Sequence, residues 1–205
     1  MAWVMFDYGG VMSRCPSEQD TAMLAGAAGT SVRRLADAYW QRRSAYDRAE
    51  LTADAYWQQI GLLVGRSQAY SPAKVAELTR LDTDSWLHLE GGTVALIEEL
   101  ALAGHRLAIL ANAPVEIAEA IAGLPVARHF EHLVFSCQLK TGKPATECFA
   151  GTLAILGITA PEVIFIDDQP DNVAAAVTLG MQSIRFTGPG QARALLTQLL
   201  ARHRW

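Results

Sequence analysis

Two stretches of the sequence decide the fold: Trp3-Val-Met-Phe-Asp-Tyr-Gly-Gly10 and Val163-Ile-Phe-Ile-Asp-Asp-Gln-Pro-Asp-Asn172. Each begins with four apolar residues, reaches an aspartate, and continues with residues that are typical of turns. A short apolar run of this kind is typical of a strand that is buried on both faces of a parallel sheet. We therefore expect two strands of one sheet, each with an acidic residue at its carboxyl end.

The same pattern recurs along the chain after residue 90. Apolar runs of strand length occur there at Leu107–Ala111, Leu133–Ser136, Val163–Asp167 and Ser183–Phe186, and the opening run Trp3–Asp7 is expected to be a further strand of the same sheet. Segments of helical character lie near residues 93–103, 115–122, 144–156, 170–179 and 190–202. Gly104, Gly157 and Gly180 follow three of these segments, where a left-handed C-cap residue is favoured. Strands that alternate with helices predict an α/β fold with a Rossmann-like parallel sheet sandwiched by helices. The amphipathic tail Gln191–Trp205 is expected to pack on this sheet.

Residues 16–88 interrupt this pattern. They contain no convincing strand, and helices are expected near residues 31–48, 52–63 and 72–82. The last of these begins at Ser71-Pro72, where a capping hydroxyl precedes a proline at the first helical position. Four of the five tyrosines and three of the five tryptophans fall in this segment, but none of the six phenylalanines does. We therefore expect a helical cap domain at 16–88, inserted into a core domain made of 1–15 and 89–205.

Composition and charge exclude several classes of protein. With 205 residues, 51% of them apolar, the chain buries a substantial core and is neither disordered nor fibrous. A net charge of −4 argues against nucleic acid as a partner, because phosphate binding needs a clustered cationic face. No apolar stretch is long enough to cross a membrane, and the start of the chain does not resemble a secretory leader. Cys15, Cys137 and Cys148 form no CxxC pair, which favours unpaired thiols and a cytoplasmic location.

Polar residues follow several of the predicted strands. Asp7, Asn112 and the pair Asp167-Asp168 stand at strand ends, and Lys143 lies in a loop after the third strand of the chain. In an open parallel sheet, ligands bind beyond the carboxyl ends of the strands. Carboxylates brought together at such an edge repel one another unless a cation lies among them, and oxygen ligands suit Mg²⁺. Any one of these residues is explained equally well as a helix cap or a surface group, but their convergence predicts a site.

The chain resembles the haloacid dehalogenase superfamily of phosphohydrolases, in the subfamily IA-like branch with a helical cap after the first strand. The matching elements, in family order, are Phe6-Asp-Tyr-Gly-Gly-Val11, Leu110-Ala-Asn112, Gly142-Lys-Pro144 and Ile166-Asp-Asp168 with Asn172. The resemblance implies a Mg²⁺-dependent phosphohydrolase that acts on a small phosphorylated metabolite such as a sugar phosphate. We further expect the protein to work as a monomer or a homodimer.

The resemblance also implies roles for single residues. Asp7 would be the nucleophile that forms an aspartyl-phosphate, and Lys143 would neutralise the phosphoryl oxygens and hold that nucleophile. Asp168 would bind Mg²⁺ directly, and Asp167 would orient the metal or its water. The carboxylate of Asp7 and the backbone carbonyl of Gly9 would complete the metal ligands.

A second group of residues is expected around the phosphate and the substrate. Those assigned to binding are Gly9, Gly10, Ala111, Asn112, Lys143 and, from the cap, Arg43 and Tyr46. Asn172 is expected to support the metal ligands from behind. Arg43 and Tyr46 belong here because the cap is the only part large enough to close over a substrate.

Two positions depart from the family pattern. Gly9 stands where the family usually has an aspartate that acts as general acid, and Ala111 stands where it has a serine or threonine. A general acid is worth roughly 10²–10⁴ in rate, so its loss favours a leaving group that needs little protonation, such as an anomeric hydroxyl. Two alternatives stay open: a binding protein with attenuated turnover, and a metal-independent 2-haloacid dehalogenase. The pair Asp167-Asp168 argues against the dehalogenase, because a metal-free site gains nothing from clustered anions.

Overall fold

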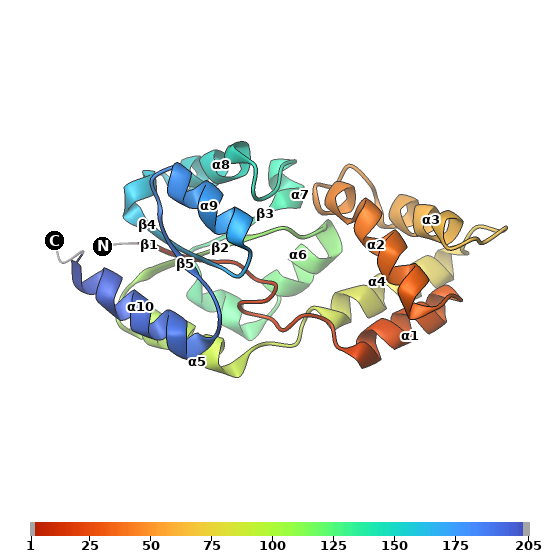
Figure 1. The fold of residues 1–205 in the computed structure, drawn as a ribbon, viewed down its shortest axis with the longest axis horizontal. Coiled ribbons are helices and arrows are strands. Elements are labelled where there is room, and N and C mark those ends of the chain that lie inside the picture. Colours follow the sequence, from red (N-terminus) through yellow and green to blue (C-terminus); the bar gives the residue numbers. More distant parts are fainter. Residues whose placement is uncertain (1–2, 203–205) are drawn as a thin grey trace.

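The computed structural model describes residues 3–202, and its centre is a five-stranded parallel sheet (Figure 1). The strands are β1 Trp3–Phe6, β2 Arg106–Ala111, β3 His132–Phe135, β4 Val163–Asp167 and β5 Gln182–Arg185. Their order across the sheet is β3-β2-β1-β4-β5. The α/β fold predicted from the sequence is confirmed. Phe6 of β1 is in register with Ile166 of β4, so that the next residues, Asp7 and Asp167, emerge side by side at the sheet edge.

Helices cover both faces of the sheet. They are α5 Gly91–Leu102, α6 Val115–Ala122, α7 Ser136–Leu139, α8 Thr146–Leu156, α9 Pro170–Thr178 and α10 Pro189–Arg202, with short 3₁₀ helices η1 Pro125–His129 and η2 Ala160–Glu162. Val4 and Phe6 pack in one cluster with α5, α6 and α10, whereas Trp3 and Met5 pack in another with α8 and α9. This alternation is why β1 reads as a continuous apolar run. Gly104, Gly157 and Gly180 adopt the expected left-handed conformation.

The C-terminal tail packs as expected as far as the structure describes it. Ala192 and Leu196 of α10 are buried in the cluster that includes Val4 and Phe6. Residues 203–205 of the predicted tail lie outside the described residues. No helix between residues 3 and 202 is both long and apolar enough to span a membrane.

Between β1 and α5 the chain forms four helices, which we call the cap: α1 Glu18–Ala28, α2 Val32–Asp47, α3 Ala53–Leu63 and α4 Pro72–Ser85 (Figure 1). They enclose a hydrophobic cluster of their own, with Tyr56, Trp57 and Leu78 at its centre. Three of the four helices were expected from the sequence, but α1 was not. Its signal is a reciprocal capping box between Ser17 and Asp20. The domain limits at 16 and 88 stay a prediction.

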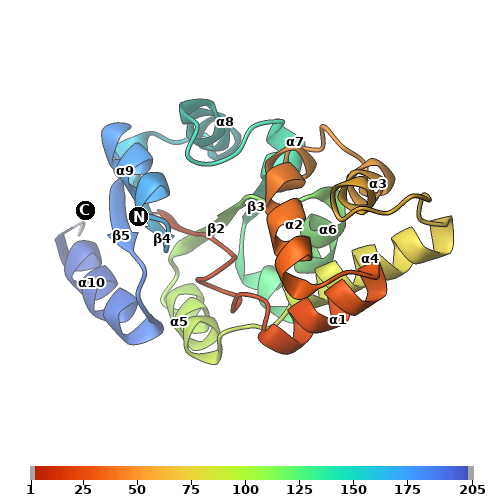
Figure 2. The same ribbon diagram turned by 45° about the vertical axis from the view of Figure 1, so that its right-hand side comes forward.

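The two connections between core and cap run side by side (Figure 2). Ser13 and Leu89 form an antiparallel bridge, the backbone N–H of Arg14 donates to the carbonyl of His88 at 2.9 Å, and that of Glu90 donates to the carbonyl of Met12 at 2.8 Å. The chain therefore enters and leaves the cap at one place, next to the sheet edge that carries Asp7.

Candidate active site

Asp7 is the first residue after β1 and lies at the carboxyl edge of the sheet. Its backbone N–H donates to the carbonyl of Ile166 at 2.8 Å, which continues the pairing with β4. Its Oδ1 accepts hydrogen bonds from the backbone N–H of Tyr8 at 2.6 Å and from Nζ of Lys143 at 2.7 Å. Burial raises the pKa of Asp7 to about 7, although Lys143 opposes this shift. Oδ2 makes no hydrogen bond within residues 3–202, so it is the oxygen of Asp7 that remains available to a ligand.

Lys143 is buried between two carboxylates. Its Nζ lies 2.7 Å from Oδ1 of Asp7 and 2.7 Å from Oδ2 of Asp167. Burial favours the neutral amine, but the two carboxylates outweigh it and hold the pKa of Lys143 above its usual range. The lysine therefore stays an ammonium group and bridges β1 and β4 at the sheet edge.

Asn112 holds the backbone of this lysine. Its Oδ1 accepts from the backbone N–H of Lys143 at 2.9 Å, and its Nδ2 donates to the carbonyl of Lys143 at 2.9 Å. A Cβ atom on Gly142 would lie 2.8 Å from the same Oδ1, so glycine is needed for this approach. Asn112 also lines the cavity described below, and the second hydrogen of its Nδ2 is not used on Lys143. Its positioning role is added to the predicted contact with phosphate, which stays a prediction.

The two aspartates after β4 differ in their surroundings. Asp167 is fully buried and accepts from Lys143, from the backbone N–H of Gln169 and from Nδ2 of Asn172, which supports it from behind. Asp168 is half-buried, and its Oδ2 accepts from Nε2 of Gln169 at 2.7 Å. Its Oδ1 is buried and has no partner among the described residues. Burial and then the neighbouring Asp167 raise the pKa of Asp168.

These residues fit a divalent cation. Asp7, Asp167 and Asp168 each offer a carboxylate oxygen, and the three oxygens lie within 4.8 Å of one another. Three carboxylates face one ammonium group, and the buried Oδ1 of Asp168, which has no hydrogen-bond partner, is an oxygen that a cation could bind. An all-oxygen donor set is what Mg²⁺ prefers. Gly10, at a φ of 77°, allows the close approach, because a Cβ there would lie 2.7 Å from Oδ2 of Asp168.

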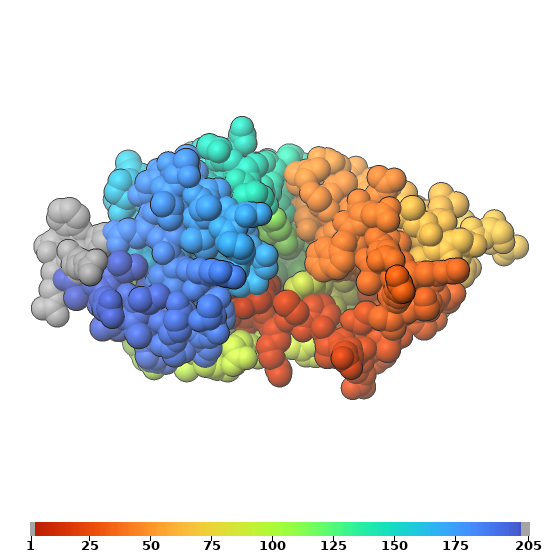
Figure 3. Space-filling model, in the orientation of Figure 1, coloured from red at the N-terminus to blue at the C-terminus, as the bar shows by residue number. Residues whose placement is uncertain are grey.

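A cavity of about 630 Å³ lies between this edge and the cap, and the surface is hollowed there (Figure 3). From the core it is lined by Asp7, Gly9, Ala111, Lys143 and Asp168. From the cap it is lined mainly by α1, α2 and the end of α4. A volume of this size suits a small organic ligand.

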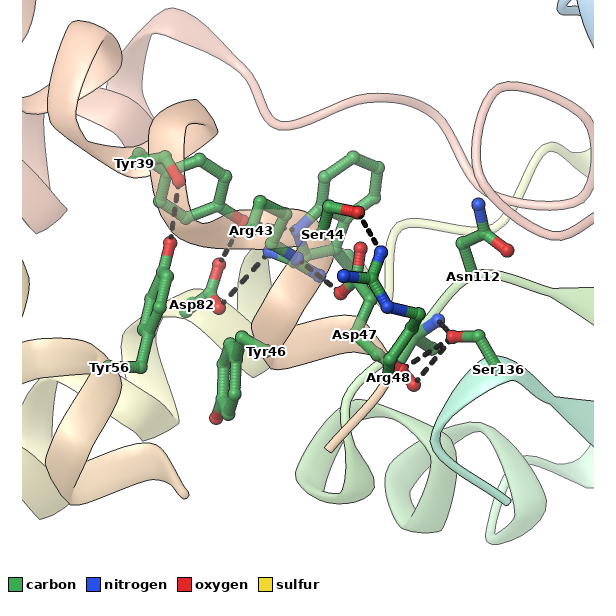
Figure 4. Close-up of polar contacts among 12 residues, drawn as sticks. Tyr39, Arg43, Ser44, Tyr46, Asp47, Arg48, Tyr56, Asp82, Asn112 and Ser136 are labelled. Atoms are coloured by element: carbon green, nitrogen blue, oxygen red, sulfur yellow. Dashed lines mark hydrogen bonds and ion pairs between the residues drawn. The ribbon is translucent and has the colours of Figure 1, made fainter. Parts of the chain in front are cut away.

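Arg43 of α2 lines this cavity as predicted, but it is already paired (Figure 4). Its Nε lies 2.6 Å from Oδ1 of Asp47, and its Nη1 lies 3.4 Å from Oδ2 of Asp82. Tyr39 donates its hydroxyl hydrogen to Oδ1 of Asp82 at 2.7 Å, and the guanidinium lies over the rings of Tyr39 and Trp86. Burial raises the pKa of both Asp47 and Asp82, although Arg43 opposes the shift.

Two sequence predictions need correction here. Tyr46 is not among the residues that line the cavity: its ring stacks on Tyr56, and its hydroxyl donates to Oε2 of Glu116 at 2.7 Å. It therefore links cap to core and does not reach the substrate space. Gly10 is not in the lining either, and its backbone N–H donates to the carbonyl of Ser13 at 2.8 Å, so that N–H is not free for phosphate.

Sequence reasoning missed Asp47, Asp82 and Trp86, which all line the cavity. Asp47 follows Arg43 by four residues on one helix, and this spacing was an available signal. Asp82 lies on another helix and gives no local signal. The excess of aromatic residues in 16–88 pointed to Trp86 only in general terms.

The family model of haloacid dehalogenase-like hydrolases matches residues 2–180, which is most of the chain. The chain belongs to the haloacid dehalogenase-like hydrolases. The comparison with curated protein sequences found no match.

Several solved structures share the fold of this hydrolase. A haloacid dehalogenase family enzyme from Bacteroides thetaiotaomicron, in complex with magnesium and inorganic phosphate, has a TM-score of 0.72 and 17% identity, covering 90% of this chain and 93% of that one. A predicted family hydrolase from Porphyromonas gingivalis has a TM-score of 0.75 and 19% identity, covering 100% and 99%. A 2-haloacid dehalogenase from Pseudomonas syringae pv. Tomato has a TM-score of 0.70 and 17% identity, covering 98% and 99%. At these identities the likeness shows the fold, and the neighbours include both a phosphate complex and a dehalogenase.

Proposed function

We propose that this hydrolase is a Mg²⁺-dependent phosphatase that acts on a small phosphorylated metabolite through an aspartyl-phosphate on Asp7. The observation that supports this proposal is the cluster of three carboxylates beside Lys143, with Oδ1 of Asp168 buried and unpartnered. A dehalogenase that works without metal gains nothing from this excess of negative charge, because the like charges only raise the cost of burial. A phosphatase needs a cation there, because the phosphoryl group is itself negative.

In the proposed reaction, Oδ2 of Asp7 attacks phosphorus and the bond from phosphorus to the leaving oxygen breaks. Water then attacks the phosphorus of the aspartyl-phosphate, which releases inorganic phosphate and restores the carboxylate. Tyr8 and Lys143 orient Asp7 by engaging its Oδ1, and Lys143 also places a positive charge beside the phosphoryl oxygens. Mg²⁺ held by Asp7, Asp167 and Asp168 would supply further neutralisation of the phosphoryl charge.

The rest of the proposal concerns the substrate and the setting. The cavity between cap and core has room for a sugar phosphate, and closure by the cap keeps bulk water out. The proposal includes a cytoplasmic location, which the free thiols of Cys15, Cys137 and Cys148 support. It also includes action as a monomer or a homodimer, without a nucleic-acid or membrane partner.

The test is phosphate release from a panel of phosphate esters with Mg²⁺, and again after chelation with EDTA. We expect Asp7→Asn to lower turnover at least about 10³-fold, because no other group replaces the nucleophile. Asp37→Asn, an exposed position on α2, is the matched control and is expected to leave turnover unchanged. Phosphate release that survives Asp7→Asn, or halide release from 2-haloacids without metal, would overturn the proposal.

A further inference from the structure

The indole ring of Trp86 covers Gly9, the second residue after the nucleophile. A Cβ atom on Gly9 would lie 3.1 Å from Cζ3 of Trp86. Both residues line the cavity that contains Asp7. The space where a side chain at position 9 would stand beside Asp7 is therefore filled by an aromatic ring from the end of the cap.

Polar contacts hold both the backbone and the ring of Trp86 in place. The backbone carbonyl of Trp86 accepts from the hydroxyls of Tyr8 at 3.0 Å and Ser13 at 2.5 Å, both on the core. Its Nε1 donates to the hydroxyl of Tyr39 at 3.2 Å, and the guanidinium of Arg43 lies 5.6 Å from the ring centroid. The indole of Trp86 is therefore held in a defined position and forms one wall of the cavity.

The polar groups nearest this wall are already used. The hydroxyl hydrogen of Tyr8 is donated to the carbonyl of Trp86 at 3.0 Å and is not available to a leaving group. Asp82 accepts from Tyr39 and pairs with Arg43, and Asp47 pairs with Arg43 as well. The side of the cavity next to Gly9 therefore presents an apolar ring and no free proton donor among these groups.

We propose that Gly9 and Trp86 together determine specificity for phosphate esters with an acidic leaving hydroxyl on a ring with an apolar face: the lack of a proton donor at position 9 selects the acidic hydroxyl, and the indole of Trp86 selects the ring. Anomeric sugar phosphates and aryl phosphates share this chemistry. The inference rests on the proposed phosphatase function. When Oδ2 of Asp7 forms its bond to phosphorus, the electron pair of the breaking bond goes to the leaving oxygen, which departs as an anion. An acidic hydroxyl tolerates this, and its ring packs on the indole.

The expected size of the substrate preference follows from the lack of a general acid at position 9. General acid help is worth roughly 10²–10⁴ in rate, and an ordinary alcohol leaving group forgoes all of it. We therefore expect a preference of at least about 10²-fold in kcat for a substrate whose leaving oxygen needs no proton. A leaving group without a ring gains nothing from Trp86 and has a higher KM.

A matched pair of substrates tests this: glucose 1-phosphate and glucose 6-phosphate, assayed with saturating Mg²⁺. They carry the same sugar, but only the first has an acidic leaving hydroxyl. 4-Nitrophenyl phosphate represents the aryl phosphates, and because its leaving group needs no general acid, its hydrolysis shows whether the site has phosphatase activity at all. Equal turnover of the two glucose phosphates would overturn the leaving-group preference, and an unchanged KM for ring substrates in Trp86→Ala would overturn the role of Trp86. Absence of phosphate release from all three, the aryl ester included, would instead overturn the proposed function.

Variants separate the ring from the missing acid. Trp86→Ala is expected to raise KM for ring substrates about 3- to 10-fold and to keep the leaving-group preference. Gly9→Asp alone is expected to gain nothing, because its side chain meets the ring. Combined with Trp86→Ala, Gly9→Asp is expected to raise turnover of glucose 6-phosphate by at most about 10²-fold. Trp86→Phe keeps an aromatic ring at this position. If Trp86→Ala fails to fold, the substrate preference and KM can be measured on Trp86→Phe instead.

A rival source for the proton is Asp47, which also lines the cavity. If Asp47→Asn lowers turnover of glucose 6-phosphate at least tenfold and spares 4-nitrophenyl phosphate, the proton comes from Asp47 and the proposal is wrong. We expect no such split. Asp37→Asn on the same helix is the matched control for the change of charge.

Discussion

Two clusters of buried charge face the same cavity, and they are built differently. At the sheet edge, Asp7, Asp167 and Asp168 share one lysine, and a carboxylate oxygen is left without a partner. In the cap, one arginine lies between two carboxylates and under two aromatic rings. The cap cluster has one cation for two carboxylates, and both carboxylates contact it, whereas the sheet-edge cluster has one cation for three carboxylates, of which Asp168 does not contact it. Buried charge that is internally paired keeps a structure together, and buried charge that is short of a counterion marks a place for a ligand.

The largest effect on stability is expected from Arg43→Met. This change leaves Asp47 and Asp82 buried without their cation, and breaking a buried pair in this way costs about 3–5 kcal/mol of unfolding free energy. Because the cap cluster is not a metal site, adding Mg²⁺ is not expected to restore the loss. Urea unfolding with and without Mg²⁺ measures both quantities. Arg42→Met, the exposed neighbour on α2, is the control. Equal stability of the two variants would show that the cap cluster does not hold the cap together.

The second effect is the dependence of Mg²⁺ stabilisation on pH. The pKa of Asp7 is raised to about 7, so the folded protein holds a proton there that the unfolded chain has lost above about pH 4. Without metal, this group therefore makes stability fall as the pH rises from about 4 to about 7. Mg²⁺ requires the ionised carboxylate, so we expect its stabilisation to be greater at pH 8 than at pH 5.5, by up to about 2 kcal/mol.

Thermal melts at both pH values, with and without Mg²⁺, measure this difference. Asp168→Asn is expected to reduce the Mg²⁺ shift at either pH, because it removes a metal ligand. Arg43→Met is expected to retain the shift. A shift that is the same at pH 5.5 and pH 8 would mean that Asp7 does not bind the metal.

The smallest effect is expected from Tyr46→Phe. It removes one hydrogen bond, from the tyrosine hydroxyl to Glu116, and keeps the stacked ring, so the cost is about 0.5–1.5 kcal/mol. Tyr70→Phe is the matched control, because the Tyr70 hydroxyl donates to the carbonyl of Ala28 inside the cap. We expect both variants to lose similar stability but only Tyr46→Phe to change KM, since of these two hydrogen bonds only that of Tyr46 joins the cap to the core. Equal KM values would refute the linking role.

The sheet edge was readable from the sequence because its signals are local. A strand buried on both faces shows an apolar run, and the acid that ends the run marks both the strand end and the site, as at Asp7 and Asp167. The cap gave less. Helix α1 was missed because it begins with polar residues, and its start is marked only by the pair of Ser17 and Asp20.

The errors in the cap have one physical origin. Arg43 and Tyr46 are both buried on α2 and lie close to one face, yet one lines the cavity and the other packs on Tyr56. Helical spacing says which residues share a face, but not what that face meets. The partner that makes burial of Arg43 tolerable, Asp82, lies on a different helix, so no local pattern announces it.

The paired connections at Ser13 and Leu89 have a consequence for how the molecule is put together. Paired residues in an antiparallel bridge lie only about 5 Å apart. The segment that forms the cap therefore begins and ends at neighbouring points of the backbone. Removing or replacing that segment leaves two ends that a tight turn can join, with no sheet hydrogen bond broken. The cap helices could therefore be exchanged for another segment at this one point of the backbone, and the carboxyl ends of the strands, with Asp7 and Asp167, would keep their places.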